Sequence, residues 1–396
     1  MGNKLNTILK NIRKKTGSCS FAESKILKIN GYIDTGSYAI NRIISGNIYN
    51  GVPEGRIVTF YGPSQSGKSY VIAQIIKNAI LKNKYDIVFY VDSEGGSLWS
   101  FLEDEGVDLN KIEHIPISSV EEGCIALLNI YKDLEEVNSG KKSKRGKKNK
   151  DVDEEDDEKE NVEAEQKDNI KALVIIDSFK MVADKFITDA TDKNKVVQDM
   201  GTTARLKNAL MNSLMMKVMK TQSPLIIANH VYENPAAMFT SKIKDMPGGS
   251  GLVFASHVII QTAKKLIKDD GDNDIIIDNE EVEAGGYYRG NTLKFFSVKN
   301  RIIKPGYEAE IYIDFSKGIG KWDGLIEDAK RLGFIKGGAA GRYEVPTYSD
   351  KKVKMSDLLT NDKIWESFID EFNRKSAEEV SYSTRNKDKE LDELIK

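Results

Sequence analysis

The sequence predicts an α/β fold in which a mostly parallel β-sheet is covered by helices on both faces. Between residues 56 and 228, short apolar runs alternate with longer segments whose apolar residues recur at helical spacing. A glycine-rich motif stands where the first apolar run meets the first helical segment. After residue 251, apolar segments follow one another without helices between them, which indicates an antiparallel or mixed extension of the same sheet.

The first expected element is a short amphipathic helix near the N-terminus. Its apolar residues are Leu5, Ile8, Leu9 and Ile12, edged by lysines and an arginine. A helix this short is marginal by itself, so its apolar stripe should dock on another surface. That surface is either the core of the same chain or the core of a neighbouring copy.

The remaining elements follow in order along the chain. The expected strands of the parallel part are 57–61, 86–91, 172–176 and 225–228, and the expected helices are 70–81, 124–134 and 206–218. The expected strands of the extension are 252–262, 292–298 and 309–315. The tail from 321 to 396 is more polar and has helical patterns at 325–332 and 365–372, which predicts a small α+β C-terminal domain.

Composition excludes several classes of protein. The chain has 396 residues, 40% hydrophobic and 30% charged, so it can bury a sizeable core and keep a polar surface. No apolar run has the length needed to span a bilayer. Two cysteines without metal-ligand spacing favour a reducing compartment. A net charge of −2 argues against a protein that coats polyanions with its whole surface. We expect a cytoplasmic protein with no membrane partner.

One segment has the composition of a disordered surface insertion, residues 138–168. Residues 141–150 are mostly lysine and arginine, and residues 151–165 are mostly aspartate and glutamate. Blocks of like charge with few apolar residues cannot offset the entropy lost on ordering. The basic half could touch nucleic acid and the acidic half could compete for it; a solvated loop without a partner is the alternative.

The glycine-rich motif predicts a site for a nucleoside triphosphate. Residues 62–69 match G-x-x-x-x-G-K-[ST] at every fixed position, with a strand before them and a helix after them. Backbone N–H groups of such a loop surround phosphate oxygens at a helix N-terminus. Lys68 would contact the β- and γ-phosphates, and the Ser69 hydroxyl would bind Mg²⁺. We assign to ATP the residues Gly62, Pro63, Ser64, Gln65, Ser66, Gly67, Lys68, Ser69 and Tyr70.

Three further side chains are expected at the same edge of the sheet. Asp177 ends a buried apolar strand and is the expected second Mg²⁺ ligand, with a helix N-cap as the alternative. Glu94 follows the strand after the motif helix and is a candidate to position the attacking water. His230 closes another strand, where a structural role is the alternative.

The order of these motifs resembles the RecA family of homologous-recombination ATPases, and within it the phage branch represented by the UvsX recombinase. The resemblance runs from about residue 31 to residue 346 and is carried by residues 55–58, 61–63, 92–94 and 106–108. It implies that Glu94 is the catalytic glutamate and that Phe101 stacks on adenine, a core ring being the alternative. It also implies that His230 senses the γ-phosphate, where the bacterial members have glutamine.

The resemblance further implies residues that meet DNA and a neighbouring protomer. Segments 184–198 and 231–251 resemble the two DNA-binding loops, and Arg205 resembles a phosphate contact. The end of the second loop is Gly248, Gly249, Ser250 and Gly251. Lys299 and Arg301 resemble basic residues that reach the γ-phosphate bound by the adjacent subunit; two basic residues on a solvated face are the alternative.

The expected protein is therefore a DNA-dependent ATPase that exchanges DNA strands. Its partners would be single- and double-stranded DNA and further copies in a helical filament, with a single-strand-binding protein and a loader as further candidates. The expected division is 1–50 for the polymerisation helix and linker, 51–320 for a RecA-like core and 321–396 for the C-terminal domain and tail. A ring helicase or KaiC-like ATPase is the alternative, and a non-catalytic mediator is a third hypothesis.

Overall fold

The computed structural model describes residues 2–96, 98–139, 169–179, 202–231, 249–270, 273–277, 288–314, 318–338 and 341–382. The expected first DNA loop at 184–198, most of the second at 231–251 including Gly248, and nearly all of the insertion at 138–168 lie outside these residues. In the described part of the chain, no helix is long and apolar enough to cross a membrane.

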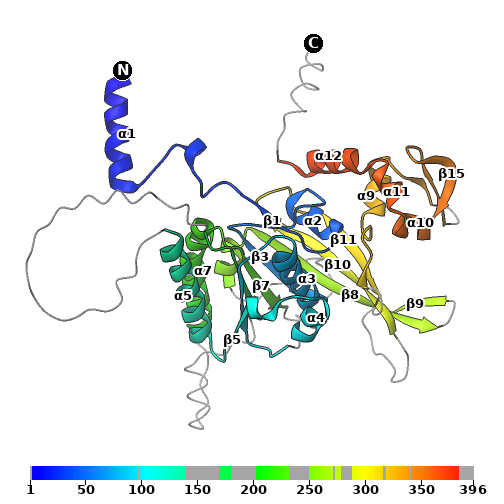
Figure 1. Cartoon of the computed structure of the whole chain (residues 1–396), viewed down its shortest axis with the longest axis horizontal. Coiled ribbons are helices and arrows are strands. Elements are labelled where there is room, and N and C mark those ends of the chain that lie inside the picture. The colour runs from blue at the N-terminus through cyan, green and yellow to red at the C-terminus, as the bar shows by residue number, and fades with distance from the viewer. Residues whose placement is uncertain are drawn as a thin grey trace, which may run out of the picture.

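A large mixed sheet forms the centre of the molecule (Figure 1). Across the described residues its strand order is β12-β11-β10-β8-β3-β7-β6-β4-β5, with β9 paired to β8. The strands are β3 (Ile57–Gly62), β4 (Ile87–Asp92), β5 (Ile112–Pro116), β6 (Ala172–Asp177), β7 (Leu225–His230), β8 (Val258–Asp270), β9 (Asn273–Ile277), β10 (Tyr288–Asn300), β11 (Glu308–Asp314) and β12 (Gly318–Ile319). β5, β4, β6, β7, β3 and β8 pair in parallel, and β8 to β12 pair antiparallel, as the sequence predicts.

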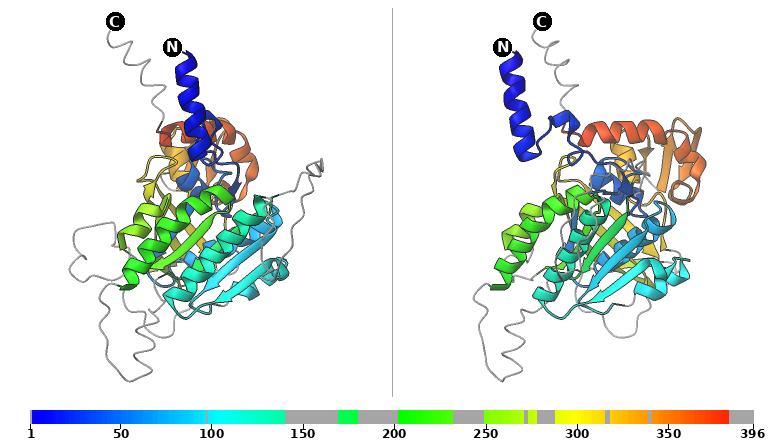
Figure 2. Two further views of the ribbon diagram at one scale, coloured as in Figure 1. Left: turned by 90° about the vertical axis from the view of Figure 1, so that its left-hand side faces the viewer. Right: turned by 60° about the vertical axis from the view of Figure 1, so that its left-hand side comes forward.

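Helices cover both faces of this sheet, because successive strand residues point to opposite sides. On β6, Leu173 and Ile175 pack with the helices α2 (Tyr38–Ser45) and α3 (Lys68–Leu81). Val174 and Ile176 pack on the other face, with α5 (Val120–Asn138), α7 (Thr202–Thr221) and α8 (Gly249–Ala255). Figure 2 shows α5 and α7 lying side by side over that face.

The carboxyl ends of the parallel strands lie together at one edge of the sheet. The parallel register places Gly62 at the end of β3 beside His230 at the end of β7. It also places Asp92 at the end of β4 beside Asp177 at the end of β6. Ligands of open α/β sheets bind at such an edge, so this register selects the location of the site.

Two of the expected elements are different in the structure. The expected strand at 252–262 is wrong in its first part, because 252–255 belong to α8 and β8 starts at Val258. Leu252 and Ala255, three residues apart, both face the core, and a short apolar run of this kind does not distinguish a strand from a buried helix. The expected helix at 365–372 is split into α11 (Asp362–Glu366) and α12 (Ile369–Val380). The edge strand β5 was not predicted.

The N-terminal helix α1 (Gly2–Thr16) is longer than the predicted helix and stands clear of the core (Figures 1 and 2). The side chains of its apolar stripe are exposed: Leu5 57%, Ile8 55%, Leu9 41% and Ile12 46%. Of the two docking surfaces expected from the sequence, the core of the same chain is therefore not the one used in this structure. A 3₁₀ turn at Phe21–Glu23 and the short strands β1 (Tyr32–Ile33) and β2 (Val52–Pro53) connect α1 to the sheet.

The C-terminal elements pack around an aromatic cluster. They are α9 (Ile326–Arg331), β13 (Lys336–Gly337), β14 (Arg342–Val345), β15 (Ser349–Lys354), α10 (Met355–Thr360), α11 and α12. The rings of Trp322 and Trp365 stack with centroids 4.8 Å apart, and Phe334 stacks on Phe368 at 5.2 Å.

The remaining short helices of the core are α4 (Leu98–Asp104) and a 3₁₀ turn at Leu109–Lys111.

A buried arginine joins the C-terminal elements to the core. Arg42 of α2 forms ion pairs with Asp328 at 2.8 Å and with Glu379 at 3.1 Å. Its Nε also donates to the Ser376 hydroxyl, and its guanidinium lies over the Tyr307 ring, 5.4 Å from the centroid. The Arg42 side chain is almost completely buried. Water therefore cannot take its place beside the two carboxylates unless the C-terminal elements separate from the core.

Replacing Arg42 by methionine should loosen the attachment of the C-terminal elements. The substitution removes the buried cation of Asp328 and Glu379 and leaves the more exposed Arg331 paired with both carboxylates. We therefore expect a loss of about 2 kcal/mol in the free energy of unfolding, measured by urea titration. Arg374→Ala is the control, because Arg374 pairs with Glu371 and Glu378 on an exposed helix face. Equal unfolding midpoints for both variants would contradict the role of Arg42.

Candidate nucleotide-binding site

The glycine-rich loop between β3 and α3 has the shape of a phosphate cradle. A Cβ atom at Gly62 would lie 2.2 Å from the Thr262 hydroxyl oxygen. Gly67 has φ +85°, and a Cβ atom there would lie 2.3 Å from Leu293 Cδ1. The Ser66 and Thr262 hydroxyls are hydrogen-bonded at 2.6 Å, which fixes the loop against β8. The loop ends at the N-terminus of α3, where backbone N–H groups are available to an anion.

Lys68 is buried with its ammonium turned back over this loop. Its Nζ donates to the carbonyl oxygens of Gly62 at 3.1 Å and Pro63 at 2.7 Å. Burial lowers the pKa of Lys68 to about 8, against the opposing effect of the carboxylates of Asp177 and Glu94. A bound phosphate would compensate the buried charge better than two carbonyl groups do, which makes this ammonium a strong anion partner.

Ser69 and Asp177 lie in contact and form a candidate metal-binding pair. The Ser69 hydroxyl donates to Asp177 Oδ2 at 3.3 Å, and the Tyr90 hydroxyl donates to the same oxygen at 2.9 Å. Burial raises the pKa of Asp177, and the nearby carboxylate of Glu94 adds to that effect. A hydroxyl and a carboxylate are hard oxygen ligands of the kind that Mg²⁺ prefers, so the pair fits this ion.

Glu94 and His230 meet at the same end of the site. His230 Nε2 lies 2.6 Å from Glu94 Oε1, although 135 residues separate them in the sequence. His230 is the last residue of β7, and Glu94 follows the end of β4. The contact therefore results from the alignment of strand ends described above.

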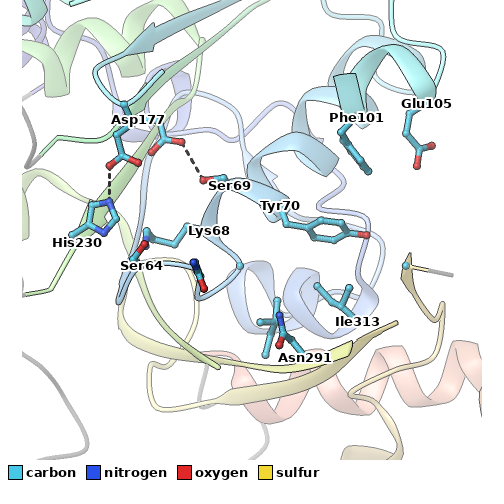
Figure 3. Close-up of a pocket in the computed structure, with 15 residues that line it drawn as sticks. Ser64, Lys68, Ser69, Tyr70, Phe101, Glu105, Asp177, His230, Asn291 and Ile313 are labelled. Atoms are coloured by element: carbon cyan, nitrogen blue, oxygen red, sulfur yellow. Dashed lines mark hydrogen bonds and ion pairs between the residues drawn. The ribbon is translucent and has the colours of Figure 1, made fainter. Parts of the chain in front are cut away.

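These side chains line a cavity of about 680 Å³ with a charged end and an aromatic end (Figure 3). Lys68, Ser69, Asp177 and His230 lie at one end, and the rings of Tyr70 and Phe101 lie at the other, 5.7 Å apart. The cavity has the volume of a small-molecule site. A charged end beside an aromatic end matches a nucleotide, whose phosphates and base differ in the same way.

Several lining residues were not found by sequence reasoning. They are Glu105, Asn291, Leu293, Ile313 and Gly318. Most of these come from the antiparallel strands β10 to β12, far along the chain, so no local motif marks them. Sequence reasoning also missed Tyr90, which lies outside the cavity and donates to Asp177. Tyr90 has a weak signal: in the parallel register it pairs with Ile175, two residues before Asp177 on the adjacent strand.

Lys299 and Arg301 do not line this cavity. Lys299 Nζ donates to the carbonyl oxygens of Val253 and Phe254 at the end of α8, and Arg301 donates to Phe254 at 2.7 Å. A bulge in β10 between Ser297 and Lys299 shifts the register just before them. Burial lowers the pKa of Lys299 to about 8, with a smaller contribution from Arg301.

The predicted DNA-binding residues are described only in part. Arg205 is exposed near the start of α7. Gly249, Ser250 and Gly251 form the first turn of α8 rather than a loop end, and the Gly251 N–H donates to Asn208 Oδ1 at 2.9 Å. This bond places the start of α8 against α7.

Gly67→Ala should abolish nucleotide binding. The new methyl group would enter the Leu293 side chain and strain a left-handed backbone, so the cradle must open, and affinity for a fluorescent nucleoside triphosphate should fall by more than about tenfold. Gly333→Ala is a matched control, because Gly333 has the same φ of +85° with nothing within 4 Å of its Cβ position. Equal losses in both variants would assign the effect to backbone strain alone.

Comparison with known proteins agrees with this geometry. Residues 3–140 match the family model of the RecA N-terminal domain. A recombination and repair protein of Enterobacteria phage T4 is 24% identical over 326 residues, which cover 82% of this chain and 69% of the relative. The RecA proteins of Mycoplasma mobile and Aquifex aeolicus are 25% and 27% identical over 91% and 96% of this chain, and over 92% and 94% of their own lengths. Residues 3–140 are therefore similar to the RecA N-terminal domain, and most of the chain is similar to RecA proteins.

Proposed function

We propose that this protein is an ATP-dependent DNA strand-exchange recombinase that assembles into filaments on single-stranded DNA. The observation that carries the proposal is the gathering of Lys68, Ser69, Glu94 and Asp177 around one cavity, while the cations Lys299 and Arg301 lie outside it. The names of the relatives, a recombination and repair protein and RecA proteins, support this function over a ring helicase or KaiC-like ATPase.

The site fits hydrolysis of ATP to ADP and phosphate. Lys68 holds the β- and γ-phosphates. Ser69 and Asp177 would hold Mg²⁺, which would supply positive charge beside the phosphate oxygens. Glu94 orients a water molecule and accepts its proton as the water oxygen bonds to the γ-phosphorus. The bond from that phosphorus to the β,γ-bridging oxygen breaks, and ADP retains the electron pair. Tyr70 and Phe101 hold the base.

Assembly would complete this site from a second protomer. Lys299 and Arg301 lie outside the cavity of their own chain, which supports a role at the γ-phosphate bound by a neighbouring protomer. The exposed stripe of α1 supports the same arrangement, because it has no place on its own core. In this proposal, residues 1–50 link protomers, 51–320 hydrolyse ATP and bind DNA, and 321–396 form the C-terminal domain and tail.

DNA would bind through the backbone phosphates, without sequence preference. The first turn of α8 lies against the part of α7 that follows Arg205, because the Gly251 N–H donates to Asn208 of α7. His230 is the last residue of β7 and directly precedes the segment 231–251. A γ-phosphate bound at His230 would therefore act on the start of that segment. Binding should fall steeply with salt.

The first test is the response of ATP hydrolysis to single-stranded DNA. We expect the rate to rise severalfold with DNA, and a non-hydrolysable ATP analogue to tighten DNA binding. Glu94→Gln should keep nucleotide binding and lower kcat by roughly a hundredfold. Absence of both DNA effects would refute the recombinase. Unwinding of a forked duplex together with closed rings in electron micrographs would favour the helicase, and hydrolysis by Glu94→Gln at the parent rate would move the base elsewhere.

A second test uses the pKa of Lys299. Contact with a neighbour's phosphate requires the ammonium and would raise its pKa, which is about 8 in the free chain. Assembly is therefore complete below that pH and weakens as pH rises through it, by roughly tenfold from about pH 7 to about pH 9. Lys299→Arg should remove this part of the loss, because a guanidinium stays charged.

Light scattering of filaments formed with the ATP analogue gives the measurement. Lys68 also titrates near pH 8 but is present in both chains, so the difference between the two pH profiles isolates residue 299. Of the neighbouring groups, Arg301 stays charged, and burial and adjacent cations lower the pKa of His257 to about 3, so it stays neutral. Superimposable profiles would show that Lys299 does not bind phosphate at the interface.

A further inference from the structure

The turn that carries Glu94 is held by a buried carboxylate. Asp92 is the last residue of β4, and its side chain is 5% exposed. Its Oδ1 accepts the backbone N–H groups of Glu94 at 2.8 Å and Gly95 at 2.9 Å. The Ser93 N–H donates to the Asp177 carbonyl oxygen at 2.8 Å and holds the start of the turn, and two glycines follow Glu94. Because Asp92 accepts the N–H groups of both Glu94 and Gly95, the position of Glu94 depends in part on the orientation of Asp92.

His114 holds the other oxygen of that carboxylate. It lies on the edge strand β5, and its Nε2 is 3.0 Å from Asp92 Oδ2. Since a carboxylate can only accept, the imidazole donates through Nε2. The His114 side chain is 57% exposed, although the carboxylate that it holds is buried.

The same imidazole also contacts the metal side of the site through a second route. Its ring stacks on the Tyr90 ring with centroids 6.3 Å apart and an interplanar angle of 27°. The Tyr90 hydroxyl donates to Asp177 Oδ2 at 2.9 Å. One side chain outside the nucleotide cavity thus contacts the supports of both Glu94 and Asp177.

We propose that His114 is a positioning residue for ATP hydrolysis, which acts through Asp92 to hold the turn that carries Glu94. This inference rests on the proposed ATPase activity. His114 does not line the nucleotide cavity and leaves the phosphate cradle untouched. Loss of its hydrogen bond frees Asp92 to rotate, the two N–H bonds weaken, and Glu94 samples positions from which it cannot orient water.

Three substitutions separate the hydrogen bond from the ring. His114→Gln keeps a donor at nearly the reach of Nε2, His114→Asn has the same amide one methylene shorter, and His114→Phe keeps the stacked ring without a donor. A cavity of about 490 Å³ beside His114 gives these side chains room. Glu113→Gln, an exposed change on the same strand, is the control for effects on the edge strand itself.

The measurements are kcat and KM for ATP with saturating single-stranded DNA, and affinity for the non-hydrolysable analogue. We expect His114→Phe and His114→Asn to lower kcat by roughly tenfold with KM and analogue affinity unchanged, since a hydrogen bond to a charged group is lost. His114→Gln and Glu113→Gln should stay within about twofold of the parent. Restoration by glutamine is the readout that a role in stability alone would not give.

The outcomes that overturn the inference are distinct from failure of the proposed function. Parental kcat in His114→Phe and His114→Asn would overturn it, as would equal losses in the glutamine and phenylalanine variants. A rise in KM together with weaker analogue binding would assign His114 to nucleotide affinity and would also overturn it. If the parent protein itself hydrolyses no ATP, the proposed function and this inference fall together.

Discussion

The burial of Lys68 over the glycine-rich loop is the interaction on which the rest of the site depends. Burial lowers the pKa of this ammonium to about 8, although the carboxylates of Asp177 and Glu94 act in the opposite direction and two carbonyl oxygens accept its protons in hydrogen bonds. The buried ammonium is tolerated because the ends of the parallel strands place the carboxylates of Asp177 and Glu94 at the same edge of the sheet. The charged groups that would contact a triphosphate are therefore in position before it binds, so the protein needs little reorganisation.

The sequence predicted the parallel half of the fold and the charged end of the site well, because both are local. The glycine-rich motif and Asp177 stand at the ends of strands that are buried throughout and mostly apolar, as expected of parallel strands covered on both faces. The contact between Glu94 and His230 follows from the same rule, since each residue lies at or just after the carboxyl end of a parallel strand. Once the strand order is known, the ends of β4 and β7 are expected at the same edge of the sheet, so Glu94 and His230 are expected close together.

The wall of the cavity formed by β10 to β12 was harder to predict than the rings of Tyr70 and Phe101, because it depends on pairing between distant segments. Asn291 and Leu293 enter the cavity only through the register of β10 against β8 and β11. Residues 252–255 were mistaken for strand because their burial against α7 is a tertiary contact. His114 was overlooked for the opposite reason: an exposed residue on an unpredicted edge strand shows no pattern, and its value appears only beside Asp92.

Strand β10 has a further mechanical consequence. Asn291 near its start lines the protomer's own cavity, whereas Lys299 near its end faces outward beside α8. At about 3.3 Å per residue, the two lie about 25 Å apart along one strand that is hydrogen-bonded on both sides for most of its length. Such a strand resists stretching, so it fixes the distance between these two residues. The separation between the position that lines the cavity and the position beside α8 is then a property of the sheet, whichever ligand occupies the cavity.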